Sequence, residues 1–152
     1  MATEHTAPQH VATDEALVRL IYRSTALADP MSIVLRISPG CVTRNRAMGL
    51  TSALLYGPGQ FVQTLEGSMK ALADCFAFIE RDRGHAAVTV VRIGPAPFRL
   101  FPGQPFRATA CPPAAWPRLD ALLAQHGAAP ANDISELEHA LLTLNAGRAM
   151  PG

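Results

Sequence analysis

Hydrophobic and polar residues alternate most clearly in a segment that predicts a β-hairpin. Residues 49–67 (GLTSALLYGPGQFVQTLEG) form two apolar arms separated by a Gly-Pro-Gly triplet at 57–59. Glycine tolerates positive φ and proline presets a turn dihedral, so the triplet favours a tight turn. In the second arm, Phe61, Gln63 and Leu65 fall on one face of the strand. We therefore expect a hairpin whose apolar face is interrupted by one amide.

The side chain of Gln63 lies between two large apolar residues on a face that should be buried. A buried amide without a hydrogen-bond partner costs about 1–3 kcal/mol. We therefore expect Gln63 to have a partner. A side chain or water within the protein would satisfy it, and so would a polar ligand; the pattern alone leaves both open.

The segments before the hairpin predict a strand and a helix. Residues 17–24 (LVRLIYRS) alternate as a first strand, and Asp29 followed by Pro30 is typical of a helix start. This helix contains Ser-Pro-Gly at 38–40. A proline inside a helix costs about 3 kcal/mol and a glycine about 1 kcal/mol. We expect a kink or break there, with a second short helical piece over 41–47.

After the hairpin the pattern predicts a second helix and two more strands. Ser68 can cap a helix that ends near Arg81, and the apolar run 87–93 predicts a fourth strand. A fifth strand over 106–110 should start late or lie at an edge because of Pro105. The first four strands and two helices follow the order βαββαβ. With right-handed crossovers, this order predicts a ferredoxin-like sheet ordered 4-1-3-2.

The C-terminal part of the chain predicts two amphipathic helices, at 116–126 with Gly127 as C-cap, and at 134–145. Asp133 with Glu136 suggests a capping box for the second. Their apolar residues need a surface to cover, and the sheet face opposite the first two helices is vacant. The predicted fold class is therefore α+β, a ferredoxin-like βαββαβ sandwich with an extra strand and two C-terminal helices.

This reading divides the chain into three parts. Residues 1–15 are polar and rich in Ala and Thr, which predicts a disordered N-terminal tail. Residues 16–110 form the predicted domain, and 111–152 form a helical extension that packs on its sheet.

Composition excludes several classes of function. The chain has 152 residues, and 49% of them are hydrophobic. Its net charge of +1 does not indicate a surface that binds nucleic acid or membrane. No apolar run has membrane-spanning length. No CxxC pair is formed by the three cysteines, which are Cys41, Cys75 and Cys111. Their spacing argues against a zinc site or a disulfide framework. Cysteines without a disulfide framework fit a reducing cytoplasm. No Ser/His/Asp, Walker or GxGxxG signature is present, so we expect no enzymatic activity.

Four short motifs together resemble one known family. They are IYRS on the first strand, RNRAMGLT before the second, FVQTLEG on the third and DRGH after the second helix. In combination they are similar to the BLUF family of blue-light sensors using FAD, over residues 17–106. The resemblance matches the family's light-sensing Tyr to Tyr22, its flavin-anchoring Asn to Asn45 and its switching Gln to Gln63.

The resemblance implies a photochemical role for these residues. Flavin would be the chromophore, as FAD or, alternatively, FMN or riboflavin, with the protein supplying position and hydrogen bonds. Tyr22 would donate an electron and a proton to excited flavin, with Gln63 as the relay. Rotation or tautomerisation of the Gln63 amide would change which group it offers to the flavin carbonyl. Asn45 would hold the polar edge of the ring.

Further positions match flavin-lining residues of the family less specifically. Ile37, Leu54, Phe61 and Ile79 would wall the ring pocket, although they also fit an ordinary core. Arg44 and His85 match lining positions but also fit a solvated surface. The cofactor-binding residues implied by the resemblance are Tyr22, Ile37, Arg44, Asn45, Leu54, Phe61, Gln63, Ile79 and His85.

Three segments depart from the family pattern, one of them Gly84, which stands where a basic residue is common before the His. Pro39-Gly40 interrupts the helix that walls the flavin, which predicts weak flavin binding. Where the family usually shows Trp-x-Met on the fifth strand, this chain has Gln-Pro-Phe at 104–106, which favours a divergent readout.

The sequence thus predicts a cytoplasmic blue-light photoreceptor that signals to a protein partner or through its own oligomer, and binds neither nucleic acid nor membrane. The alternative is a flavin-free interaction module on the same fold. A small ferredoxin-like enzyme such as an acylphosphatase fits less well, because a convincing phosphate-binding loop is missing.

Overall fold

A computed structural model of the chain describes residues 16–125 and 134–147. The tail predicted for residues 1–15 lies outside these ranges, as do the predicted caps at Gly127 and Asp133.

A five-stranded sheet ordered β4-β1-β3-β2-β5 forms the centre of the protein. The strands are β1 (Val18–Ala26), β2 (Thr51–Gly57), β3 (Gln60–Gly67), β4 (His85–Pro95) and β5 (Arg107–Ala110). The helices are α2 (Pro30–Ala47), α3 (Met69–Arg81), α4 (Trp116–Gln125) and α5 (Glu136–Asn145), with a 3₁₀ turn η1 (Pro113–Ala115) before α4. The order confirms the predicted 4-1-3-2 arrangement and the α+β class. β5 pairs parallel with β2 at one edge, where Pro105 delays its start to Arg107.

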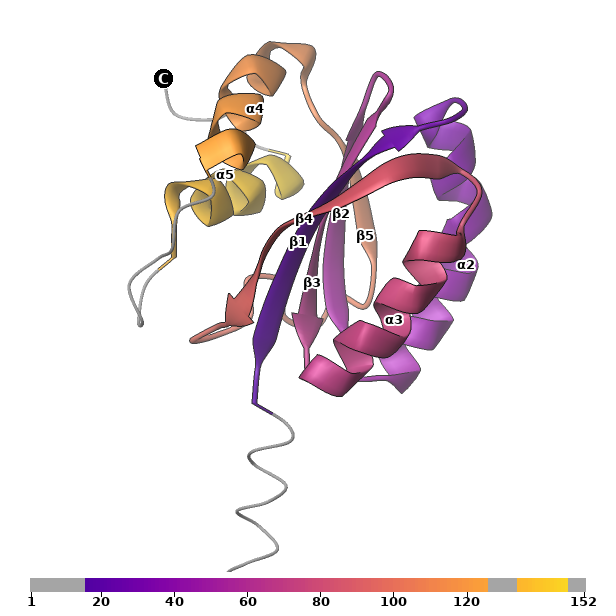
Figure 1. Cartoon of the computed structure of the whole chain (residues 1–152), viewed down its shortest axis with the longest axis vertical. Coiled ribbons are helices and arrows are strands. Elements are labelled where there is room, and N and C mark those ends of the chain that lie inside the picture. Colours follow the sequence, from indigo (N-terminus) through magenta and orange to yellow (C-terminus); the bar gives the residue numbers. More distant parts are fainter. Residues whose placement is uncertain (1–15, 126–133, 148–152) are drawn as a thin grey trace, which may run out of the picture.

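The sheet is covered on both faces (Figure 1). Helices α2 and α3 lie on one face, and α4 and α5 on the other. One apolar cluster, which includes Leu20, Leu65 and Leu72, lies under α3. Another, which includes Ile21 and Leu55, lies under α4 and α5. Because the central strands are buried on both faces, a residue on β1 or β3 points either to the α2–α3 layer or to the α4–α5 layer.

Of the kink or break predicted in the first helix, the break with a separate second piece is wrong, because α2 runs without interruption over 18 residues. Pro39 removes the amide that would bond the carbonyl of Leu35, and Leu35 is 68% exposed, so water can take the place of that donor. The hydroxyl of Ser38 donates to the carbonyl of Val34 at 2.6 Å and keeps this turn bonded. The weak flavin binding predicted from a break therefore loses its basis.

The capping box of α5 is formed by Ser135 and Glu138, not by Glu136 with Asp133, which lies outside the described residues. The hydroxyl of Ser135 accepts from the amide of Glu138, and the carboxylate of Glu138 accepts from the amide of Ser135 at 2.8 Å. The S-x-x-E motif thus lies two residues further along than expected. As a result Glu138, rather than Glu136, is turned towards the sheet and is 1% exposed.

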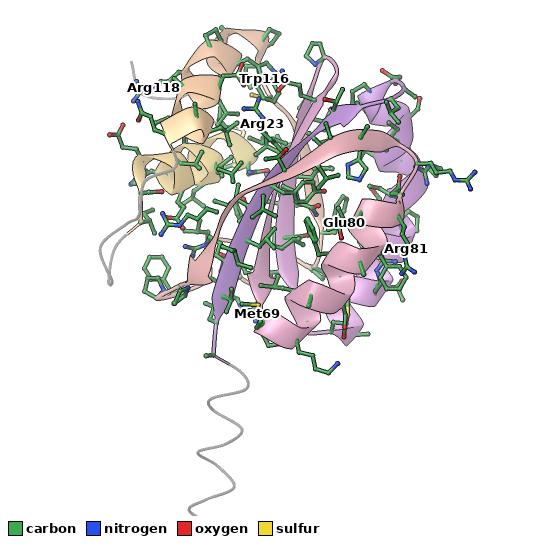
Figure 2. All side chains as sticks on the ribbon, in the orientation of Figure 1. Arg23, Met69, Glu80, Arg81, Trp116 and Arg118 are labelled. Atoms are coloured by element: carbon green, nitrogen blue, oxygen red, sulfur yellow. The ribbon has the colours of Figure 1, made fainter. Side chains whose placement is uncertain are left out.

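The indole of Trp116, at the start of α4, packs against Gly57 at the hairpin turn (Figure 2). A Cβ on Gly57 would lie 2.1 Å from Trp116 Nε1, so only glycine leaves room for the ring. Across the described ranges, no helix is both long and apolar enough to cross a membrane.

Candidate functional site

An open pocket lies between α2, α3 and the sheet. It is lined by Tyr22, Ile33, Ile37, Cys41, Asn45, Leu54, Phe61, Gln63, Cys75, Phe78, Ile79, Asp82, His85 and Phe106.

Two rows of helical residues wall the pocket. From α2 come Ile33, Ile37, Cys41 and Asn45, each four positions after the last, so they lie along one face of an uninterrupted helix. From α3 and its end come Cys75, Phe78, Ile79 and Asp82, at helical spacing. The walls are thus mainly apolar, with polar groups at the two ends.

Tyr22 and Gln63 form the polar centre of the pocket floor. They are cross-strand partners on β1 and β3, and the phenol donates to Gln63 Oε1 at 2.6 Å. Their residues are only 4% and 5% exposed. Within residues 16–125 and 134–147, no group accepts a hydrogen bond from Gln63 Nε2. The amide therefore has one end held by the protein and one end available to a group in the pocket.

The phenol of Tyr22 stays protonated across the physiological pH range. Burial raises its pKa well above the ordinary value, and the charges that Cys75, Cys41 and Asp82 can carry raise it further. Burial also raises the pKa of the Cys75 thiol to about 11. The hydroxyl therefore keeps the hydrogen that it donates to Gln63 Oε1 in this structure.

His85 contributes a ring rather than a free hydrogen-bonding group. Its Nε2 lies 2.7 Å from the carbonyl of Ile79, which can only accept, so Nε2 carries a hydrogen. Its Nδ1 lies 2.7 Å from the hydroxyl of Ser24. With both nitrogens engaged, the imidazole packs edge-on against Tyr22 and Phe61, at centroid distances of 6.2 and 6.3 Å.

Asn45 connects three segments at the other end of the pocket. Its Nδ2 donates to the carbonyl of Pro105 at 2.9 Å, and the hydroxyl of Ser52 donates to the same carbonyl at 2.8 Å. The thiol of Cys75 lies 3.7 Å from Asn45 Oδ1, a weak donor contact. The amide is thereby fixed in one orientation, with capacity on Oδ1 to accept a further hydrogen bond.

Asp82 lies at the pocket mouth and joins the two helical walls. Its carboxylate pairs with Arg36 of α2 at 3.0 Å and accepts from the amide of Gly84 at 2.7 Å. Although partial burial opposes it, these hydrogen bonds lower the pKa of Asp82 overall. The carboxylate is therefore ionised at neutral pH.

The structure brings eight of the nine predicted site residues to the pocket lining and leaves out Arg44. Arg44 packs over the ring of Phe78, 4.5 Å from its centroid, and its buried Nε has no hydrogen-bond partner among the described residues. Sequence reasoning missed Ile33, Cys41, Cys75, Phe78, Asp82 and Phe106. The i, i+4 row from Ile33 to Asn45 was visible in the sequence, but the expected break at 38–40 concealed it.

The chain matches the family described as "Sensors of blue-light using FAD" over residues 17–106. This match covers more than half of the 152 residues. The chain belongs to the BLUF family. BLUF proteins are flavin-binding sensors of blue light, and the matched segment contains every residue of the pocket.

Among proteins of known activity, the chain is similar to subunits of light-regulated cyclases. It is 36% identical over 93 residues to the photoactivated adenylate cyclase subunit beta of Euglena longa, covering 60% of this chain and 11% of that protein. It is 33% identical over 118 residues to the subunit beta-like protein FB of Euglena gracilis, covering 74% of this chain and 13% of that protein. The chain thus spans about a tenth of the length of these relatives.

Solved structures show the same arrangement. BlrB, described as a BLUF protein in its dark state, superposes with a TM-score of 0.67 at 29% identity, covering 85% of this chain and 97% of that one. BlrP1 of Klebsiella pneumoniae superposes with a TM-score of 0.58 at 27% identity, covering 86% of this chain but 33% of BlrP1. BLUF domains therefore occur both in short chains and as parts of longer ones.

The pocket residues fit a flavin ring. A flat aromatic ring needs apolar walls on both faces and polar partners at one edge, and α2 and α3 supply the walls. The unpartnered end of Gln63 and the remaining capacity of Asn45 supply polar partners at the floor and one end.

Proposed function

We propose that this BLUF chain is a blue-light photoreceptor in which Tyr22 and Gln63 form the light-responsive pair. The observation that carries the proposal is the 2.6 Å hydrogen bond between them inside a pocket suited to a flavin. Bound flavin supplies blue-light absorption and, when excited, an acceptor for one electron. The protein supplies the donor, the proton acceptor and the fixed geometry.

Tyr22 is the proposed electron and proton donor. A phenol that loses an electron becomes strongly acidic, so its proton passes to an acceptor already in hydrogen-bond contact. Gln63 Oε1 is the first acceptor, at 2.6 Å, and the Gln63 amide would relay the proton towards the flavin that takes the electron. Because burial keeps the phenol protonated beforehand, the proton is always present at the start of the step.

Gln63 is the proposed switch. An amide offers a donor at one end and an acceptor at the other, so rotation by half a turn exchanges Nε2 and Oε1. In the described state Oε1 faces Tyr22, and Nε2 has no partner among residues 16–125 and 134–147. After rotation or tautomerisation the pocket would face a different group of the same side chain. This exchange changes the hydrogen bonding of the site without moving the backbone.

We further propose that the bound flavin is FAD, as the description of the family states. One BlrP1 structure is described with FMN, so the two cofactors need to be distinguished directly. Tyr22, Asn45, Gln63 and the pocket walls would hold the ring, and Arg44 would act from outside the lining, through Phe78. Release of the cofactor by denaturation, followed by chromatography against FAD, FMN and riboflavin standards, identifies it.

The matched domain is a sensor, and we propose that this chain passes its signal to a protein partner or to a second copy rather than catalysing a reaction. The cyclase activity of the Euglena proteins belongs to those much longer chains. Cys41, Cys75 and Cys111 are all free thiols, which supports a reducing compartment such as the cytoplasm.

The test is spectroscopic. The protein, purified in the dark and reconstituted with FAD, should be yellow, and blue light should shift its flavin absorption reversibly to longer wavelength. Protein that stays colourless after reconstitution would favour the flavin-free interaction module instead.

A further inference from the structure

Three charged residues lie buried on the sheet face opposite the pocket. Arg19, Glu66 and Glu138, here called the buried ion cluster, are 3%, 0% and 1% exposed. Arg19 Nε donates to Glu66 at 2.9 Å, its Nη1 donates to Glu138, and its Nη2 donates to the carbonyl of Phe98 at 2.6 Å. One guanidinium thus joins β1 to β3, to α5 and to the segment after β4.

Two members of the buried ion cluster, Arg19 and Glu66, lie on the same two strands as the light-responsive pair. Arg19 pairs in register with Glu66, just as Tyr22 pairs with Gln63. Each of these two residues is three positions from its counterpart, which places it on the other face of the sheet, about 10 Å along the strand. A shift of β1 relative to β3 at the Tyr22–Gln63 pair should therefore also change the geometry of the Arg19–Glu66 pair.

Glu138 has two tasks at once. Its Oε1 accepts from the amide and the hydroxyl of Ser135 at 2.8 and 2.9 Å, which caps α5, while its Oε2 accepts from Arg19. Arg92 of β4 lies 3.6 Å from the same carboxylate. Although burial opposes ionisation, the hydrogen bonds from Ser135 and Arg19 lower the pKa of Glu138 overall. Any displacement of Arg19 therefore also disturbs the cap that starts α5.

Charges in such a site are more sensitive to position than apolar contacts are. A buried ion pair usually adds little net stability, because desolvation offsets the attraction between the charges. In a low-dielectric surrounding, however, its energy changes steeply with distance and geometry. The buried ion cluster is thus poorly explained as a stabilising device and well suited to report a small relative shift of β1 and β3.

We propose that the Arg19–Glu138 ion pair couples the Tyr22–Gln63 pair to the first turn of α5, so that a changed hydrogen bond in the pocket loosens the cap of that helix. The role of light as the trigger rests on the proposed function. The coupling itself does not, and it can be tested in the dark.

The test is a double-mutant cycle read by amide hydrogen exchange at Glu138 and His139. In the described state the amide of Glu138 bonds the hydroxyl of Ser135, and that of His139 bonds its carbonyl, so both amides report the cap. Four full-length proteins are compared without illumination: the parent, Gln63→Leu, Glu138→Gln and the double variant. Glutamine at 138 can still cap but cannot form the ion pair.

We expect Gln63→Leu to accelerate exchange at these two amides in the parent background and to have no such effect in the Glu138→Gln background. The matched control is Glu136→Gln, which removes a carboxylate two positions away that is 79% exposed and pairs with Arg118 at 3.6 Å. In that background the effect of Gln63→Leu should remain. If Glu138 had a purely structural role, Glu138→Gln would change the exchange rate of the two amides by the same factor in the parent and in the Gln63→Leu background.

The coupling is wrong if Gln63→Leu leaves exchange of the two amides unchanged in the parent, or if its effect survives intact in Glu138→Gln. Should Glu138→Gln fail to fold, Arg19→Lys replaces it in the cycle, because one ammonium cannot reach Glu66, Glu138 and Phe98 as the guanidinium does. Since no step uses light, a missing absorption shift in the parent would refute the proposed photoresponse without affecting this result.

Discussion

Tyr22 and Gln63 lie directly opposite each other on β1 and β3, and the phenol of Tyr22 donates to the Gln63 amide oxygen at 2.6 Å. The register of two central strands therefore positions this contact, rather than a loop. A strand pair buried on both faces holds its side chains more rigidly than a loop does. The orientation of the Gln63 amide alone thus decides whether its oxygen or its nitrogen faces Tyr22.

Removal of the Tyr22 hydroxyl should abolish the light response and leave flavin bound. Tyr22→Phe keeps the ring that packs edge-on against Phe76 but removes the only hydrogen bond that the described residues make to the side chain of Gln63. Tyr56→Phe is the matched control, because Tyr56 is the other tyrosine of the chain and its hydroxyl contacts Met31. The absorption difference between light and dark should vanish in the first variant and persist in the second. Equal responses in both would remove Tyr22 from the photochemistry.

The buried phenol of Tyr22 should also lower the free energy of unfolding as the pH rises above about 10. The pKa of Tyr22 is raised in the folded protein, so above the ordinary tyrosine value of about 10 the unfolded chain loses this proton first. Stability is then unaffected by Tyr22 below about pH 10 and declines above it. Urea unfolding from pH 8 to 11 should show a smaller decline in Tyr22→Phe than in the parent. Parallel curves would contradict the burial of an intact phenol.

The contact between Trp116 of α4 and Gly57 of the hairpin should leave no room for a methyl group at position 57. Gly57→Ala places a Cβ 2.1–2.5 Å from three atoms of the Trp116 side chain and should cost about 1–3 kcal/mol. Because Trp116 is the single tryptophan and is 8% exposed, its emission should move to longer wavelength as the ring is displaced.

Gly40→Ala is the control for Gly57→Ala, because nothing lies within 4 Å of a Cβ at that helical position. It should raise stability by up to about 1 kcal/mol and leave the emission of Trp116 unchanged. If both substitutions destabilise the protein alike, the close approach of Trp116 to Gly57 is not what excludes a side chain there.

Deletion of residues 113–152 should expose an apolar sheet face. Ile21, Leu55 and Val62 are buried beneath α4 and α5 at 0%, 0% and 1% exposure. An exposed apolar surface of this kind favours association, so the truncated protein should be poorly soluble or should form oligomers. If it still binds flavin, we expect a photocycle without the light-dependent association of the parent. A soluble, monodisperse product with unchanged light-dependent association would show that the helices neither cover the sheet nor transmit the signal.

The sheet order could be predicted because it follows from local patterns and a general rule. The alternating strands, the Gly-Pro-Gly turn at 57–59 and right-handed crossovers suffice to place β1 beside β3. That adjacency in turn predicts the proximity of Tyr22 and Gln63. Most of the pocket was therefore accessible from the sequence together with the family resemblance.

Other features depend on contacts that no local pattern contains. The continuity of α2 across Pro39 depends on the exposure of Leu35, which only the packed structure defines. Arg44 lies outside the lining because Phe78 offers it an aromatic face. The contact between Arg19 and Glu138 joins residues 119 positions apart, and sequence spacing says nothing about such a pair.

The proposed function depends on Gln63 switching its hydrogen bond in response to light. The most direct measurement is the absorption spectrum of the FAD complex before and after blue light, in the parent and in Gln63→Leu. Leucine is similar in size but can neither donate nor accept, so flavin should remain bound. We expect a reversible shift to longer wavelength in the parent and none in the variant. A normal shift in Gln63→Leu, or a parent that binds FAD without any shift, would contradict it.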